Sequence, residues 1–528
     1  MARASRRGQG RERGRHERGH AGAQRRGQGR ERGRQDDRAR RSKSPAGRDR
    51  GSAATTGRAG HGKDPARQVA LDALTAVSRD GAYANLVLPP LLDAGGLERR
   101  DAALATALTY GTLRLQGRYD AIIAVCVDRP LERIDAVVLD LLRLGAHQLL
   151  GMRVPSHAAV SATVDLATTA AGRGAATFVN AVLRRIAGRT LQAWIAELRE
   201  SAGDETQALA WVESHPVWVV KALRQALIAN GRPDEELGAL LAADNEDPQV
   251  VLCARPGLIA PEHLARQAAA ACGHEPRLGD ISPVSVLLGG GDPGRIGAVR
   301  DSRAAVEDEG SQLVALMLAQ ERLEGRDERW LDMCAGPGGK AALLASVAAQ
   351  RGARVVANEI APHRADLVRG ALRAIASGVA EVRCHDGRRY GHEEPGHYDR
   401  ILVDAPCSGL GSLRRRPEAR WRRSQADVAE LADLQRELLA SAMAAVRVGG
   451  VVAYVTCSPH VLETSLAVRD ALRRLERGGI GVEVLHAGDA ATRIAPRPPA
   501  GAEAQMLQLW PHTDSTDAMF CALLRRTS

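Results

Sequence analysis

Two cysteines stand where apolar runs of the sequence end. Cys407 follows the run RILVDAP at 400–406, Cys457 closes the run GVVAYVTC at 450–457, and a serine comes directly after each. A lone buried cysteine is most often a small hydrophobic side chain, but a thiolate is also a strong nucleophile. Two thiols at neighbouring strand ends, with the carboxyl group of Asp404 close by, favour covalent catalysis.

A glycine-rich turn, LDMCAGPGGKAALLA, lies between an expected strand and an expected helix. Glycines let a backbone approach a ligand closely, and a helix N-terminus offers free N–H groups. A P-loop would need glycine at 334 and serine or threonine at 341, where the chain has Cys334 and Ala341. The dinucleotide pattern G-x-G-x-x-G fits only loosely, because no third glycine stands at 341.

Two further carboxylates also stand at the ends of expected strands, as this turn does. Glu359 ends the next expected strand, about twenty residues on, and Asp386 ends the strand after that. A carboxylate in the first of these positions commonly accepts hydrogen bonds from ribose hydroxyls. Ribose and adenine contacts without a pyrophosphate motif favour S-adenosylmethionine over NAD as the cofactor.

A thiol and a methyl donor together suit the methylation of cytosine at carbon 5. That carbon becomes nucleophilic only after a thiolate adds to C6, and the thiolate is eliminated once a base has removed the C5 proton. Asp404 would hold the N3/N4 edge of the base and neutralise charge as the thiol adds. The base must be unstacked, which favours single-stranded or loop RNA. These residues do not rank the two thiols as nucleophiles.

The elements that must position these residues alternate between strand and helix after residue 301. Strand-like runs occur at 330–334, 353–359, 380–386, 400–406, 450–457, 481–486 and 518–524. The alternation predicts an α/β doubly wound, Rossmann-like domain over 301–528, whose strands end at one common edge.

Three other regions precede this domain. Helical periodicity without strand alternation predicts an all-α domain over 64–190, beginning at an Asp64 N-cap followed by proline. Further helix is expected over 191–235, and short strands between Pro/Gly turns predict a small α+β subdomain over 236–300.

Residues 1–63 differ in composition from the rest of the chain. They contain 20 of the 73 Lys/Arg but only 6 of the 63 Asp/Glu, contain no Val, Leu, Ile, Phe, Trp or Tyr, and repeat RRGQGRERGR at 6–15 and 25–34. This composition predicts a disordered Arg/Gly-rich tail, either a solubilising extension or a loose RNA-phosphate binder. It does not resemble a targeting peptide, because no apolar segment follows the arginines.

The eight cysteines are scattered without a CxxC pair, which argues against zinc and against a disulfide framework. We therefore expect no metal and a reducing, cytoplasmic location. No apolar run approaches the roughly 20 residues of a membrane span, so no membrane association is expected.

The motifs DMCAGPGGK, DAPCSG and TCS, in this order, resemble those of the RNA (cytosine-5-)-methyltransferases. Residues 64–190, including FVNAVLRRI at 178–186, resemble the RNA-binding helical domain of NusB-type antitermination factors. The pairing is similar to bacterial 16S rRNA (cytosine-5-)-methyltransferases of the Sun/Fmu type. The resemblance implies a class I S-adenosylmethionine-dependent domain and an rRNA substrate, with free rRNA and an assembling small subunit both left open.

The resemblance also assigns roles to single residues. It implies that Cys457 is the nucleophile, that Cys407 helps to resolve the covalent adduct, and that Asp404 lies between cofactor and base. Glu359 would take the ribose hydroxyls and Asp386 would lie beside the adenine. The implied cofactor loop comprises Cys334, Ala335, Gly336, Pro337, Gly338, Gly339 and Lys340, with Asp404 close to it.

The basic arm LRRRPEARWRR follows the first thiol directly. A charge run is usually a solvated surface, but its place at the rim of the expected site favours contacts with RNA phosphates. The expected RNA-binding residues are Arg414, Arg415, Arg416, Arg420 and Trp421.

Three alternatives remain open. The chain could methylate cytosine in tRNA or 23S rRNA, or it could be a non-catalytic RNA-binding or antitermination factor with a degenerate methyltransferase domain. Both thiols, Asp404 and the intact glycine turn count against the second alternative. The third, an NAD enzyme, is disfavoured by the turn sequence and by the lack of a suitable His/Lys constellation for hydride transfer.

Overall fold

The computed structural model of the protein describes residues 64–528. The predictions of a disordered tail and of loose RNA binding over 1–63 lie outside the described residues. Among the described residues, no helix combines the length and the apolar character that crossing a bilayer requires.

The chain begins with a helical region, as its periodicity predicts. The Asp64 carboxylate accepts a hydrogen bond from the Arg67 amide at 3.0 Å, and Gly81 ends the first helix in the left-handed conformation (φ +64°). Large apolar side chains of α5 pack against α6 in one core. The helices are α1 (Pro65–Asp80), α2 (Ala84–Gly95), α3 (Arg99–Arg114), α4 (Gln116–Cys126), α5 (Ala136–Leu150) and α6 (Ser156–Ala187).

Four more helices lead to a small antiparallel sheet. They are α7 (Leu191–Ser201), α8 (Glu205–Val212), α9 (Val217–Ala229) and α10 (Leu237–Ala243). The small sheet has the order β2-β3-β1-β4, with α11 (Pro261–Cys272) packed on it. Its strands are β1 (Val250–Ala254), β2 (Arg277–Leu278), β3 (Ser285–Leu288) and β4 (Ala304–Val306). The strand β4 pairs with β1, so this sheet extends past residue 300.

The main sheet has the order β10-β12-β9-β8-β5-β6-β7, and β11 adds to β12. The pairs from β7 through β9 are parallel, whereas β12 is antiparallel to its neighbours β9, β10 and β11. The strands are β5 (Arg329–Asp332), β6 (Arg354–Asn358), β7 (Ala380–Arg383), β8 (Tyr398–Asp404), β9 (Val446–Thr456), β10 (Val482–Val484), β11 (Leu507–Gln508) and β12 (Phe520–Arg526). Each strand-like run that we expected after residue 301 overlaps one of these strands.

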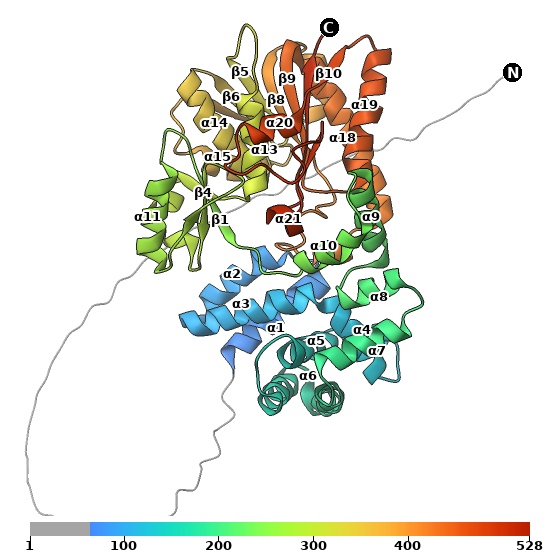
Figure 1. The fold of residues 1–528 in the computed structure, drawn as a ribbon. Coiled ribbons are helices and arrows are strands. Elements are labelled where there is room, and N and C mark those ends of the chain that lie inside the picture. Colours follow the sequence, from blue (N-terminus) through green and yellow to red (C-terminus); the bar gives the residue numbers. More distant parts are fainter. Residues whose placement is uncertain (1–63) are drawn as a thin grey trace, which may run out of the picture. The chain divides into compact units, whose positions relative to one another are not determined.

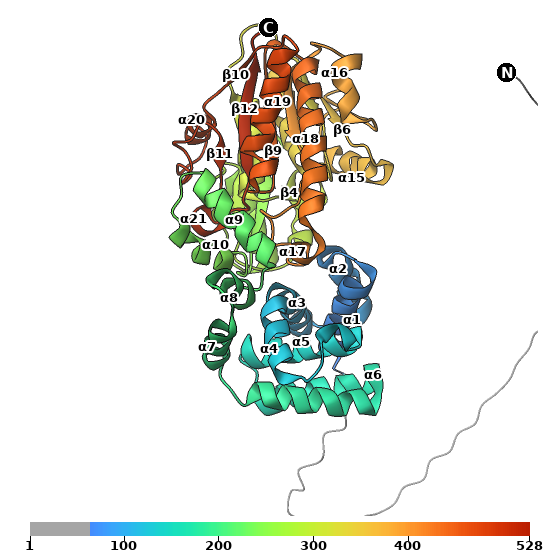
Figure 2. The ribbon, with the colours of Figure 1, turned by 90° about the vertical axis from the view of Figure 1, so that its right-hand side faces the viewer.

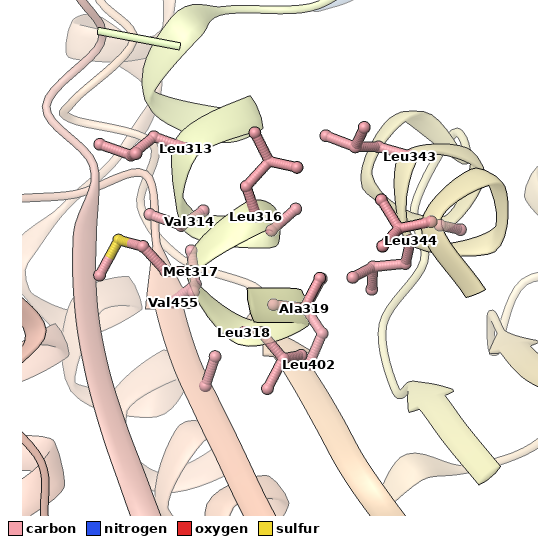
Figure 3. Close-up of a cluster of buried hydrophobic side chains, with 14 of the residues drawn as sticks. Leu313, Val314, Leu316, Met317, Leu318, Ala319, Leu343, Leu344, Leu402 and Val455 are labelled. Atoms are coloured by element: carbon pink, nitrogen blue, oxygen red, sulfur yellow. The ribbon is translucent and has the colours of Figure 1, made fainter. Parts of the chain in front are cut away.

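Helices cover both faces of this sheet (Figures 1 and 2). One face packs against α13 (Glu309–Gln320), α14 (Gly339–Arg351), α15 (Pro362–Leu372) and α20 (Ala487–Thr492), and the other against α16 (Tyr390–Glu393), α18 (Gln425–Ala445) and α19 (Ser465–Arg477). Figure 3 shows the first layer, in which Leu316 of α13 points toward Leu343 of α14, and the strands that carry Leu402 and Val455 lie beside the end of α13.

The order of the strands reverses between the parallel neighbours β5 and β8, because β6 and β7 are added on one side of β5, whereas β8 and then β9 are added on the other. In open α/β sheets, the loops after the two strands that flank such a point diverge and leave room for ligands. The turn after β5 contains the glycines, and the loop after β8 contains Cys407.

Candidate active site

The two thiols lie together, as their positions after neighbouring strands predict. Strands β8 and β9 are parallel, with Asp404 opposite Val455, so the residues that follow both strands emerge at the same edge. The sulfur atoms of Cys407 and Cys457 are 3.3 Å apart, and both residues are half-buried. A thiol at this distance can donate its proton to a neighbouring sulfur.

The surroundings of the two sulfurs differ in charge. The hydrogen bond from Cys407 lowers the pKa of the Cys457 thiol, and Lys340 acts in the same direction against burial and Asp404. The pKa of the Cys407 thiol is raised well above its usual range by that same bond, by burial and by the negative charge of Glu463. Cys457 is therefore the sulfur that favours the thiolate form.

Lys340 and Asp404 form an ion pair beside the thiols. The Lys340 Nζ atom donates to Asp404 Oδ2 at 2.9 Å, and both side chains are largely shielded from solvent. Burial opposes charge on the lysine, but Asp404 and Glu307 outweigh it and raise the pKa of Lys340 above its usual value. This lysine belongs to the glycine turn, so the ion pair joins the turn to the strand end that leads to Cys407.

The glycine turn is a backbone cradle. Gly336 and Gly338 have positive φ angles of 58° and 98°, and a Cβ atom on Gly338 would lie 2.8 Å from the Cβ of Ala371. No side chain caps α14, which begins at Gly339. The first N–H groups of the helix are therefore open to a ligand, as the residues 334–340 predict.

Glu359 and Asp386 follow β6 and β7 at the same edge of the sheet. Glu359 is buried, accepts a hydrogen bond from the Ala361 amide at 3.0 Å and pairs with Arg364 at 3.3 Å. Asp386 pairs with Arg388 at 2.7 Å, and this interaction lowers the pKa of the Asp386 carboxyl. The structure brings both carboxylates to the side of the turn on which we expect the ribose and adenine.

Two carboxyl groups near the turn were not among the expected site residues. Asp332, fully buried at the end of β5, has no partner for Oδ2 among the described residues, and burial raises its pKa to about 8. Burial also raises the pKa of Glu307 to about 7, against the attraction of Lys340. Asp332 comes just before the turn in the sequence, so the sequence could have pointed to it. Glu307 is close to Gly339 only in the folded chain, and the sequence gives no such signal for it.

A third residue that sequence reasoning missed is Glu463. It lies in the short helix η5 (Val461–Glu463), is fully buried and contacts the serines that follow both thiols. The repeated Cys-Ser pair was the only signal in the sequence that could have pointed to a shared partner.

The basic arm differs from the expectation. Arg420 is fully buried, and its guanidinium donates to the Ser214 carbonyl at 2.9 Å, to Asn245 Oδ1 at 2.9 Å and to the Asp244 carbonyl at 3.1 Å. It also donates to the carbonyl of Arg114 at 3.3 Å. These contacts hold segments together, so in this structure Arg420 does not offer its charge to a phosphate.

Two other arginines of the arm are also engaged by the protein. Arg415 pairs with Asp308 at 2.8 Å and with Asp517 at 3.1 Å. Arg414 is buried and donates to the Ser515 carbonyl at 3.2 Å. A run of arginines in a sequence cannot reveal acidic partners that lie about 100 residues away.

The remaining two of the five expected RNA-binding residues reach the surface. Arg416 is exposed, and Trp421 is 37% exposed while its ring packs over Gly117. An RNA contact by this arm therefore remains a proposal for Arg416 and Trp421.

Replacing Arg420 with methionine should lower the free energy of unfolding by about 3 kcal/mol, because four buried acceptors lose their donor. The matched change Arg416→Met, on the exposed side of the same arm, should alter stability by less than about 0.5 kcal/mol. Urea and thermal unfolding of the two full-length variants measure the difference. Equal stability of both variants would contradict the structural role of Arg420.

Comparisons with known proteins agree with this architecture. The sequence profile of the family described as 16S rRNA methyltransferase RsmB/F matches residues 319–525, and that of the NusB family matches residues 64–188. The predicted fold class, a NusB-like all-α region before a Rossmann-like methyltransferase domain, is therefore confirmed.

Individual proteins match over most of their length. A putative methyltransferase of Mycobacterium tuberculosis is 51% identical over 464 residues, which cover 88% of this chain and 97% of that protein. The ribosomal RNA small subunit methyltransferase B of Pseudomonas syringae is 33% identical over 425 residues, covering 78% and 89%. The crystal structure of a protein designated PH0851 shares the fold, with a TM-score of 0.70, 19% identity and coverage of 87% and 98%.

Because the profile match, the identity to relatives over nearly their whole length and the arrangement of the sheet all agree, the chain belongs to the 16S rRNA methyltransferase RsmB/F family.

Proposed function

We propose that the protein transfers a methyl group from S-adenosylmethionine to carbon 5 of a cytidine in 16S rRNA, through a transient bond between Cys457 Sγ and C6 of the base. The observation that carries this proposal is the pair of sulfurs 3.3 Å apart, beside the Lys340–Asp404 ion pair and next to the glycine turn. The charges around the pair favour a thiolate at Cys457.

The residues around the turn suit this methyl donor. S-adenosylmethionine supplies an electrophilic methyl group on a positively charged sulfur. The open N–H groups at the start of α14 suit its carboxylate, and Glu359 and Asp386 suit its ribose and adenine. Three acidic side chains, those of Glu307, Asp332 and Asp404, surround Lys340. They suit the cationic groups of S-adenosylmethionine.

Residues of the site are proposed for the attack, for the stabilisation of charge and for the release of the base. The Cys457 thiolate adds to C6, while Asp404 contacts the N3/N4 edge and stabilises the protonated ring nitrogen. Carbon 5, now enamine-like, would form the new bond to the methyl group as the bond between that methyl and the sulfonium sulfur breaks, which leaves S-adenosylhomocysteine. A base then removes the C5 proton, the electrons of that C–H bond restore the C5–C6 double bond, and the thiolate leaves. Cys407, 3.3 Å from the departing sulfur, assists this release.

The proposed substrate follows from the family match and from what the attack of a thiol on C6 requires of the base. The profile that matches 319–525 describes 16S rRNA methyltransferases, and a NusB-type region precedes it. The relative from Pseudomonas syringae is named for methylation of the small ribosomal subunit RNA. A thiol can attack C6 only from the face of an unstacked base, so we propose a cytidine in a single-stranded or loop region.

The test is bisulfite sequencing of total RNA from a strain that lacks this protein. We expect the loss of one 5-methylcytidine from 16S rRNA and its return when the full-length gene is supplied. Loss of the modified base from tRNA or 23S rRNA would redirect the proposal to that substrate. An unchanged pattern of 5-methylcytidine would overturn the proposed function.

A further inference from the structure

A single buried carboxylate joins the two loops that carry the thiols. Glu463 accepts hydrogen bonds from the Ser408 amide at 2.7 Å, the Ser408 hydroxyl at 2.5 Å and the Ser458 hydroxyl at 2.6 Å. Gln435 adds a fourth donor at 3.3 Å. An ionised carboxylate only accepts hydrogen bonds, so four donors around a fully buried side chain suit the charged form.

These contacts connect the two cysteines indirectly, through the serine that follows each of them. Ser408 follows Cys407, Ser458 follows Cys457, and the two serine hydroxyls are 3.1 Å apart. The β8–β9 register ends at Asp404 and Val455, before either thiol is reached. Beyond that point Glu463 joins Ser408 to Ser458, and the Gly411 amide donates to the Cys457 carbonyl at 2.9 Å, so both contacts hold the two loops together.

The negative charge of Glu463 also makes the electrostatic surroundings of the two sulfurs unequal. It acts on Cys407, where negative charge disfavours a second anion, whereas Lys340 acts on Cys457. The other charged or titratable groups facing the pair are Asp404 from β8, Tyr454 from β9 and Asp517 from the segment before β12. Both aspartates oppose a thiolate at Cys457, so Lys340 and the donated Cys407 proton must outweigh them.

We propose that Glu463 is a positioning residue that keeps the shared proton on Cys407 and so leaves Cys457 as the nucleophilic thiolate. This inference rests on the proposed function and deepens it. It gives a physical reason why one of two adjacent thiols attacks while the other retains its proton. The residue acts through Ser408 and Ser458 and does not itself contact the base.

The variant Glu463→Gln tests this role, since the amide has nearly the same shape but no charge. The measurement is site-resolved alkylation of the full-length protein by trace iodoacetamide between pH 6 and 9, read by mass spectrometry. In the wild type we expect Cys457 to react at least about tenfold faster than Cys407 near pH 7, because the pKa of Cys457 is lowered and that of Cys407 is raised. In Glu463→Gln the ratio of the two rates should fall toward one, and the pH profile of Cys457 should shift upward.

Two variants serve as controls. Glu309 is also a buried glutamate, and it accepts hydrogen bonds from the amides of Ile281 and Ser282 and the hydroxyl of Ser285. Glu309→Gln should therefore leave the alkylation ratio unchanged. Glu463→Asp retains the charge and should keep the preference for Cys457, although the shorter side chain loosens the hold on the serines.

If the ratio of the Cys457 to the Cys407 alkylation rate is the same in Glu463→Gln as in the wild type, the inference is wrong. Should Glu463→Gln fail to fold, the triple variant Glu463→Met/Ser408→Ala/Ser458→Ala removes the charge together with the two hydroxyls that donate to it. It should lower the ratio, and a wild-type ratio in that folded variant would equally overturn the inference. Alkylation needs neither RNA nor methyl donor, so its outcome is separate from the loss of 5-methylcytidine that tests the proposed function.

Discussion

Replacing Cys457 with alanine should reduce methyl transfer by at least about a thousandfold, because no other route makes carbon 5 of cytosine nucleophilic. In that variant, burial and the negative charge of Glu463 still raise the pKa of the Cys407 thiol, which disfavours Cys407 as a substitute nucleophile. The measurement is transfer of a labelled methyl group from S-adenosylmethionine to 16S rRNA. The variant should also fail to form a covalent adduct with RNA that contains 5-fluorocytidine, which lacks the removable C5 proton.

The matched control for this change is Cys521→Ala. Cys521 lies on β12 directly opposite Val455 of β9, is fully buried, and burial raises its pKa to about 12. Its removal should cost some stability but leave methyl transfer within about twofold of the wild type. If Cys457→Ala methylates at the wild-type rate, the nucleophile is another group and the proposed mechanism is wrong.

Replacing Cys407 with alanine should trap the protein on its RNA. The Cys457 sulfur remains beside Lys340 and can still add to the base, but its partner at 3.3 Å is gone when the adduct must be resolved. We therefore expect a protein–RNA adduct that survives denaturing electrophoresis, together with a fall in turnover of about a hundredfold. Attack should also require higher pH, because the hydrogen bond that lowers the pKa of Cys457 is lost.

The double variant Cys407→Ala/Cys457→Ala is the control for the adduct, which should disappear with the nucleophile. Clean turnover by Cys407→Ala, with no accumulated adduct, would contradict the release role. An adduct formed by the double variant would show that a third group of the protein bonds to the base.

Much of the site could be predicted because strand ends in a parallel sheet converge. Cys407 and Cys457 are 50 residues apart in sequence, yet each follows a strand, and parallel neighbours β8 and β9 bring the sulfurs together. The glycine turn and the carboxylates of Glu359 and Asp386 could be placed by the same argument. Nothing beyond strand–helix alternation and the position of each residue after its strand was needed.

The partners of charged side chains could not be predicted in this way. Arg420 was expected at the surface because it belongs to a basic run, but Asp244 and Asn245, which satisfy it, lie some 175 residues earlier. Glu463 is 55 residues from Ser408, and no periodicity connects them. Whether a charge is solvated or buried depends on such distant partners, and one sequence does not reveal them.

The buried guanidinium of Arg420 has a practical consequence for anyone who divides this protein into fragments. Its acceptors include carbonyl groups of Arg114 at the end of α3 and of Ser214 between α8 and α9. A recombinant truncation that starts at 236 would delete both and leave the guanidinium with only its acceptors on Asp244 and Asn245. It would also uncover the apolar side chains that pack against α9. Such a fragment should express poorly and aggregate, so the catalytic half is best produced together with the helices that precede it.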